Sequence, residues 1–292
     1  MTVRRQAKQS GSHDLRENPV SLSKLYIGVA FHGIELTGAH LKFAYESLLV
    51  WQTKTAGAEP THGVIYGRGS TERIITFKVL KARLLKSDVK HLTGFDLFTL
   101  APDRESPMWQ HSVQAHVSNN YRRIVLSASS SLTSLGLEGE LLDVTRTLLA
   151  LAAPRYGYVF FRDKSIRGHA GGTALCYGMG IPTVSLEHAL EKSDETPFLQ
   201  EWRLHVEKLR LYDKGILRDL YRWNFLNEAQ LRRKVERKQL RNWIAADPSR
   251  GELQEIEGPL QLWMLTDEQI ANVRPVLWDA GVLFNWRDYR DP

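Results

Sequence analysis

Six basic side chains lie within ten residues and form the most distinctive chemical feature of the sequence. They are Arg232, Arg233, Lys234, Arg237, Lys238 and Arg241. Guanidinium and ammonium groups bind phosphates and carboxylates. At helical spacing Arg233, Arg237 and Arg241 line up, with Lys234 and Lys238 beside them. The spacing predicts a basic helix over 228–244 that binds either nucleic acid or an acidic partner protein.

A glycine-rich loop is the second candidate site, with Arg167, Gly168, His169, Gly171 and Gly172 as its possible anion or ligand contacts. Glycines let a ligand approach the backbone, whose N–H groups can hold an anion. The glycine order is not a dinucleotide fingerprint, and no Gly-Lys-Ser/Thr follows. A plain connection packed against a sheet fits as well. An enzyme with a site near 167–180 remains an alternative.

Catalytic and metal-binding patterns are otherwise missing, so we assign no catalytic residue, no metal ligand and no cofactor. Asp96, Glu105 and Lys78 are residue types of a metal-dependent nuclease, but they lack its spacing, and we interpret them as solvated charges. The ten histidines include no His-Glu-x-x-His pair. Cys176 stands between Leu175 and Tyr177 and is interpreted as a small buried hydrophobe.

The net charge of +6 belongs to one region of the 292-residue chain. Residues 201–241 hold twelve Lys or Arg and six Asp or Glu, so the remainder is neutral. Such local basicity is typical of a binding surface, although a solvated helix face is the simpler reading. One cysteine and no apolar leader indicate a cytoplasmic protein. The apolar runs are too short for a membrane span, so we expect no membrane partner.

The elements that must position these residues alternate in type. Strands are predicted at 25–31, 73–79, 95–100, 109–117, 121–127 and 156–161, helices at 37–51 and from Leu137 to Pro154, and a long loop at 54–70. Ser118-Asn119-Asn120 predicts a hairpin turn. The order indicates an α+β fold, mainly an antiparallel sheet with helices packed on one face.

Residues 196–292 are predicted to form a basic, helix-rich lobe that contains a β-hairpin at 251–265. Asn227 with Gln230 and Thr266 with Gln269 have the spacing of capping boxes, and Gly281 suits a helix end. We therefore predict three regions. Residues 1–20 form a disordered basic tail, 21–195 an α+β sheet domain, and 196–292 a lobe packed on that domain.

One stretch carries a family resemblance. The helix that runs into Ala153-Pro154-Arg155-Tyr156-Gly157-Tyr158-Val159, after a strand, a helix, a long loop and strands, resembles bacterial immunity proteins of type VI secretion and polymorphic-toxin systems. The similarity spans 21–225 and is chiefly to the group that neutralises restriction-endonuclease-fold toxins. No family binding residue maps onto this chain, and nuclease blockers are often acidic whereas this chain is basic.

The resemblance implies a non-enzymatic inhibitor that binds a toxin domain. A protein-binding module of this immunity class is therefore the leading hypothesis for function. The alternative that the residues keep open is a nucleic-acid-binding protein, for example in phage defence, which would use the predicted helix 228–244.

Overall fold

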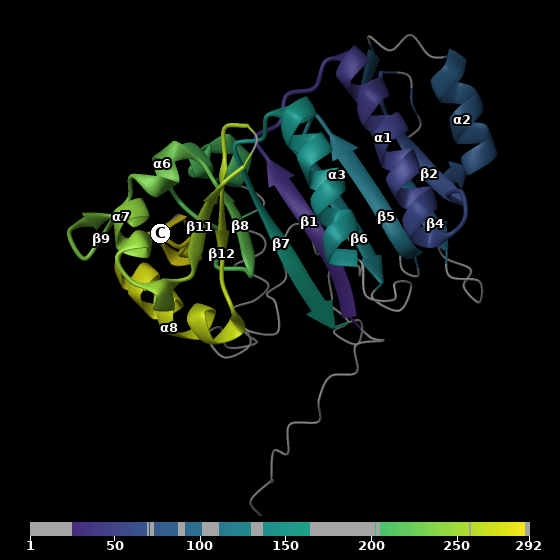
Figure 1. The fold of residues 1–292 in the computed structure, drawn as a ribbon. Helices are drawn as coiled ribbons and strands as arrows, with labels where there is room; N and C mark the ends of the chain where they lie inside the picture. The colour runs from purple at the N-terminus through teal and green to yellow at the C-terminus, as the bar shows by residue number, and fades with distance from the viewer. Residues whose placement is uncertain are drawn as a thin grey trace, which may run out of the picture.

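The structure is a computed structural model, which describes residues 25–68, 70, 73–86, 91–100, 111–129, 137–163, 202, 205–256 and 258–289. Within these ranges, ten strands form one sheet in the order β11-β12-β8-β7-β1-β6-β5-β4-β2-β3 (Figure 1). Each neighbouring pair of these strands is antiparallel. The predicted α+β class with a mainly antiparallel sheet is confirmed.

The strands of this sheet are β1 (Leu25–His32), β2 (His62–Gly67), β3 (Ile75–Thr76), β4 (Leu92–Leu100), β5 (His111–Ser118), β6 (Arg123–Ser129), β7 (Tyr156–Asp163), β8 (Trp223–Leu226), β11 (Glu252–Glu255) and β12 (Gln261–Met264). The longer helices are α1 (Gly38–Ala56), α2 (Phe77–Lys86), α3 (Leu137–Ala152) and α8 (Asp267–Asp279). Short helical segments are η5 (Leu211–Lys214), α6 (Glu228–Leu231), α7 (Leu240–Ala245), η6 (Pro248–Arg250) and η7 (Trp286–Tyr289). A separate two-stranded ribbon pairs β9 (Lys234–Val235) with β10 (Lys238–Gln239).

One face of the sheet is apolar and is covered by α1 and α3, which lie side by side in front of the strands in Figure 1. Thr37 starts α1 by accepting a hydrogen bond from the backbone N–H of His40, and Gly57 ends it in the left-handed conformation. Leu41 and Leu48 from α1 and Leu141 from α3 are buried in this core. Their helical spacing is the pattern that predicted both helices.

Around β7, the opposite face of the sheet packs against the C-terminal third of the chain. A second core joins Tyr156 and Tyr158 of β7 to Trp202, Trp263 and Phe284, which come from much later in the sequence. The sheet itself also continues into this region, because β8 pairs with β7 and β12 pairs with β8. The C-terminal third therefore shares both the sheet and a core with the first part of the chain.

Several local predictions are confirmed. β5 and β6 form the hairpin that turns after Ser118, and β11 and β12 form the later one. Both capping boxes are present, at Asn227 and at Thr266. Gly281 has a φ of 63° directly beyond the α8 cap, as a helix end requires.

Two secondary-structure predictions, for residues 54–70 and 73–79, were wrong. The predicted loop at 54–70 contains strand β2, and the predicted strand at 73–79 is only the short β3 followed by helix α2. Phe77 and Leu80 are three residues apart and both buried, so from Phe77 onward the apolar residues follow the spacing of a helix rather than that of a strand. Gly63 sits where a Cβ would lie 2.3 Å from the Asp96 carbonyl oxygen, so the glycine that suggested a loop instead permits close strand pairing.

Candidate functional site

The predicted basic helix over 228–244 does not exist; this prediction was wrong. Helix α6 ends at Leu231, and residues 234–239 form the β9–β10 hairpin before α7 begins at Leu240. Val235 pairs with Lys238, which leaves Glu236 and Arg237 as a two-residue turn with φ of 48° and 68°. Positive φ at both positions is the geometry of a type I′ turn.

The apolar residues explain why a hairpin replaces the helix. Leu231, Val235 and Leu240 are all buried in the C-terminal core. The step from Val235 to Leu240 is five residues, so a continuous helix would turn one of them away from that core. The hairpin buries all three side chains and leaves the basic residues between them exposed, except for Arg233, which is half-buried.

Two of the predicted binding residues, Arg232 and Arg241, are paired with one carboxylate. Arg232 Nε donates to Glu228 Oε1 at 2.8 Å, and an Arg241 guanidinium nitrogen donates to Glu228 Oε2 at 2.6 Å. The Arg232 hydrogen bond is the main cause that lowers the pKa of Glu228 from its usual value. These pairs are exposed, so each is worth about 0.2–1 kcal/mol. They hold the base of the hairpin in place.

A third predicted residue, Arg233, is built into the fold. Its guanidinium donates to the Gly281 carbonyl oxygen at 2.7 Å, which links the hairpin to the end of α8. Its stem packs on Gly215, where a Cβ would lie 2.6 Å from Cδ of Arg233. Glycine is therefore required at position 215, both for this contact and for its φ of 77°.

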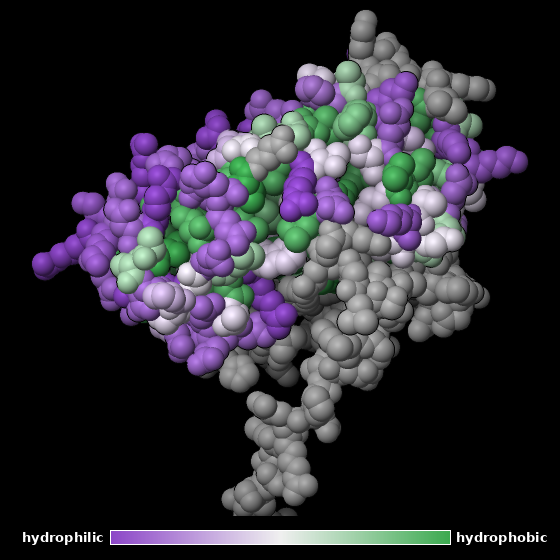
Figure 2. All heavy atoms as spheres, in the orientation of Figure 1, coloured by the Kyte–Doolittle hydropathy of each residue, from purple (hydrophilic) through white to green (hydrophobic). Residues whose placement is uncertain are grey.

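The remaining three predicted residues, Lys234, Arg237 and Lys238, are exposed on the hairpin, which we call the basic hairpin (234–239). Figure 1 shows β9 projecting at the far end of the molecule from α2. Figure 2 shows hydrophilic side chains over this end. Within the described part of the chain, none of the three forms an ion pair. Their charges are directed to solvent.

The turn of the basic hairpin is braced from α7 and η6. Trp243 Nε1 donates to Glu236 Oε2 at 2.7 Å, and an Arg250 guanidinium nitrogen lies 3.7 Å from the same oxygen. Arg250 also stacks on the Trp243 ring, at 4.1 Å from its centroid, and donates to the Trp243 carbonyl oxygen at 2.8 Å. These contacts hold the turn in one position and leave the side chains of Lys234, Arg237 and Lys238 uninvolved.

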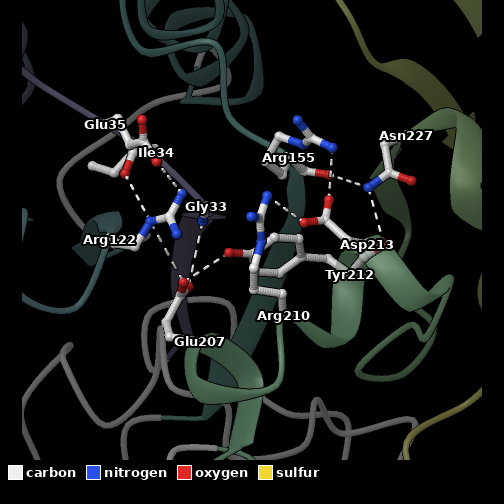
Figure 3. Close-up of polar contacts among 10 residues, drawn as sticks. All are labelled: Gly33, Ile34, Glu35, Arg122, Arg155, Glu207, Arg210, Tyr212, Asp213 and Asn227. Carbon is white, nitrogen blue, oxygen red and sulfur yellow. Dashed lines mark hydrogen bonds and ion pairs between the residues drawn. The ribbon is translucent and has the colours of Figure 1, made fainter.

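The other end of the site is anchored by Asn227, the cap of α6 (Figure 3). Its side-chain nitrogen donates to the carbonyl oxygens of Arg155 at 2.7 Å and Tyr212 at 3.0 Å. Its side-chain oxygen accepts from the Gln230 N–H at 3.0 Å. Asn227 therefore ties the start of α6, and through it the basic hairpin, to the residue that precedes β7 and to η5.

Figure 3 also shows a cluster of charged side chains around Arg155 and η5, which we call the charged junction. Asp213 accepts from Arg155 at 2.7 Å and pairs with Arg210 at 2.6 Å. Glu207 accepts from the Tyr212 hydroxyl at 2.8 Å and lies 4.0 Å from Arg122. Arg122 also pairs with Glu35, so three arginines face three carboxylates. Because these charges balance, we interpret the junction as a structural connection rather than a binding site.

Sequence reasoning missed a series of buried polar side chains on the face of the sheet opposite α1 and α3. Asp96 and His116 are each 2% exposed, so the interpretation of Asp96 as a solvated charge was wrong. His116 Nδ1 lies 2.5 Å from Asp96 Oδ1, and the Tyr66 hydroxyl donates to Asp96 Oδ2. Arg123 Nε donates to His116 Nε2 at 3.3 Å. No motif signals this series, because its members come from β2, β4, β5 and β6.

In the arrangement observed, the hydrogen bonds among Tyr66, Asp96, His116 and Arg123 have a structural role. The Asp96 carboxylate holds the imidazole with its proton on Nδ1, as in a nucleophile-activating triad. The other nitrogen, however, accepts from Arg123 Nε, and among the described residues no hydroxyl group forms a hydrogen bond with it. Burial is the main cause that lowers the pKa of His116, and it also lowers the pKa of His32 nearby on β1. Both rings are therefore neutral near pH 7.

The remaining sequence candidates fall outside the described residues. These are the tail 1–20, the loop with Arg167, Gly168, His169, Gly171 and Gly172, and Cys176. In the described ranges, no three His, Cys, Asp or Glu side chains are grouped as metal ligands. Among the helices of those same ranges, none is long and apolar enough to cross a membrane.

Comparison with known proteins yields one distant structural neighbour to report. No protein-family model and no curated protein matches the sequence. A solved T6SS (type VI secretion system) protein of Pseudomonas aeruginosa matches with a TM-score of 0.44 and 13% identity. The match covers 82% of this chain and 64% of that one, so this chain spans less than two thirds of its neighbour. The chain is thus distantly similar in structure to a T6SS protein.

Proposed function

We propose that this chain is a protein-binding module that docks through the basic hairpin (234–239) on an acidic surface of another protein. The more specific form of the proposal is an immunity protein that neutralises a bacterial toxin. One observation carries it. Lys234, Arg237 and Lys238 project together from a braced turn, while the other predicted cations are engaged within the fold.

A rigid, small, charged projection suits a protein partner. Because Glu236 is held by Trp243, less side-chain and loop ordering is needed on binding, and preorganisation of this kind raises affinity. Complementary charge then speeds association and selects the partner.

Nucleic acid is the less favoured partner, because affinity for it rises with the number of phosphates that basic side chains contact. Because the predicted basic helix is absent, Arg233 and Arg241 are not available to contact phosphates; both are hydrogen-bonded within the fold.

The test begins with a photo-crosslinking residue at exposed Gln239, which leaves the three cations intact. A protein that crosslinks in cells is then purified, and its affinity for the full chain is measured by calorimetry. We expect the triple variant Lys234→Glu, Arg237→Glu, Lys238→Glu to weaken binding at least a hundredfold, about 3 kcal/mol.

The matched control carries the same charge change at the far end of the sheet. Lys42, Lys78 and Arg83 are exposed on α1 and α2, and their triple reversal should leave affinity within about threefold. If both triple variants bind like the wild type, the basic hairpin is not the docking site and the proposal fails. The immunity form of the proposal requires that the captured protein is toxic to a host cell. Co-expression of the full chain must then restore growth, and the triple reversal at the basic hairpin must abolish that rescue.

A further inference from the structure

Positive φ is costly for residues with a side chain, and five such residues occur in the described part of the chain. They are Arg122, Ala153, Arg210, Glu236 and Arg237, with φ between 38° and 68°. For an L-residue this conformation brings Cβ close to the following carbonyl oxygen. Such residues persist where surrounding contacts hold them, and they concentrate at functional sites.

Four of the five are held by contacts within the chain. Ala153 closes the end of α3 through its N–H, which donates to the Leu149 carbonyl oxygen at 3.2 Å. Arg122 pairs with Glu35 at 2.6 Å, and Arg210 pairs with Asp213 at 2.6 Å. Glu236 accepts from Trp243, as described above.

Arg237 is the exception. Its side chain is exposed, and it makes no hydrogen bond, ion pair or ring contact with any residue that the structure describes. Its carboxylate neighbour Glu236 is turned toward Trp243 and Arg250. Asn or Gly would be the unstrained choice at the second position of this turn. The backbone pairing of Val235 with Lys238 holds the turn, but the Arg237 side chain has no partner within the described structure.

We propose that Arg237 is the anchor residue of the interface and that it binds a carboxylate on the partner protein. This inference rests on the proposed function and adds the residue and the partner chemistry. Guanidinium binds carboxylate through two parallel hydrogen bonds. Lys234 and Lys238 flank it and add positive charge without this fixed geometry. The partner surface thus carries an Asp or Glu at its centre with further acidic groups around it.

The first experiment needs no partner. Arg237→Gly and Arg237→Asn remove the left-handed strain, so thermal denaturation of the full chain should show Tm raised by about 2 °C. The matched control is Arg210→Gly, which removes the same strain together with the Asp213 pair. It should give no gain in Tm. If Arg237→Gly lowers Tm, then Arg237 stabilises the fold itself and the inference is overturned.

The second experiment measures binding with a defined probe, a fluorescent 20-residue polyglutamate peptide, at low salt. Arg237→Gly should weaken binding at least fivefold, and Arg237→Lys should restore only part of it. The charge-matched control Arg146→Ala, which changes an exposed side chain of α3, should change the affinity less than twofold. A 20-nucleotide single-stranded DNA is measured in parallel.

The outcomes separate this inference from the proposed function. If the triple hairpin reversal abolishes peptide binding but Arg237→Gly and Arg146→Ala act alike, the hairpin binds acidic groups without an anchor, and only the inference fails. If the triple reversal leaves peptide binding unchanged, the proposed function fails as well. Tighter binding of the DNA, with a steep salt dependence, would assign the hairpin to nucleic acid and overturn both.

Discussion

Asp96 and His116 lie directly opposite each other on β4 and β5, with Asp96 Oδ1 2.5 Å from His116 Nδ1 and both side chains buried. They are 20 residues apart in the sequence, on a face of the sheet whose neighbouring positions are largely polar. Tyr66 and Arg123 extend the contact on either side. This chain of hydrogen bonds joins four strands of the sheet.

Removal of the Asp96 carboxylate should destabilise the protein strongly. Asp96→Ala leaves the His116 N–H and the Tyr66 hydroxyl without their buried acceptor, and each buried donor left unsatisfied costs about 1–3 kcal/mol. Urea denaturation followed by tryptophan fluorescence measures this change. Asp143→Ala removes a carboxylate that is 73% exposed and should cost less than about 0.5 kcal/mol. Equal effects of the two substitutions would contradict the structural role of Asp96.

Stability should fall as the pH drops below the unfolded-state pKa of histidine, 6.5. Burial is the main cause that holds the pKa of His32 and His116 below that value in the fold. Between the folded and unfolded pKa values only the unfolded chain takes up these protons, so acid favours unfolding. The loss is about 1.4 kcal/mol per pH unit for each histidine until its folded pKa is reached.

Urea midpoints at pH 7.5, 6.5 and 5.5 check this dependence. Glu207 raises the pKa of His32 and Asp96 raises that of His116, but burial outweighs both carboxylates, and Arg123 lowers the pKa of both rings further. A His116→Gln variant should show a smaller loss between pH 6.5 and 5.5 than the wild type. Constant or rising stability over that interval would rule out neutral buried histidines.

Asn227→Ala should loosen the basic hairpin as well as the cap of α6. The substitution removes a cap bond and two hydrogen bonds to the Arg155 and Tyr212 carbonyl oxygens, at a cost of about 2–3 kcal/mol. Thr266→Ala, which removes the equivalent cap of α8 alone, should cost about 1 kcal/mol. Hydrogen exchange should show faster exchange over 228–245 in Asn227→Ala only. Equal exchange in both variants would disprove the anchoring role.

The predicted domain division is tested by truncation after residue 195. We expect the 1–195 fragment to aggregate or to lack cooperative unfolding, because it loses β8 from the sheet and Trp263 and Phe284 from the core on β7. Each buried large aromatic is worth about 3–5 kcal/mol. Calorimetry and size-exclusion chromatography report the outcome. A soluble fragment with a single cooperative transition would instead establish 21–195 as an independent domain.

Local sequence patterns correctly predicted the elements that depend only on residues close together in the sequence. The apolar spacing of α3, the turn after Ser118 and the capping boxes at Asn227 and Thr266 depend on contacts within one element or one hairpin. The physics of these features is short-range: side chains three or four apart share a helix face, and a cap bonds to its own first turn. The antiparallel α+β class followed from their order.

Tertiary structure alone decided the two features that matter most for the site. Leu231 and Val235 have helical spacing, but Leu240 does not continue it, and the hairpin formed because the core around Trp243 accepts Leu231, Val235 and Leu240 together. Likewise, nothing near Asp96 in the sequence distinguishes it from a solvated acid. Its burial is stabilised by His116 and Tyr66, which are distant along the chain, and the free energy of a buried charge depends on those partners rather than on sequence neighbours.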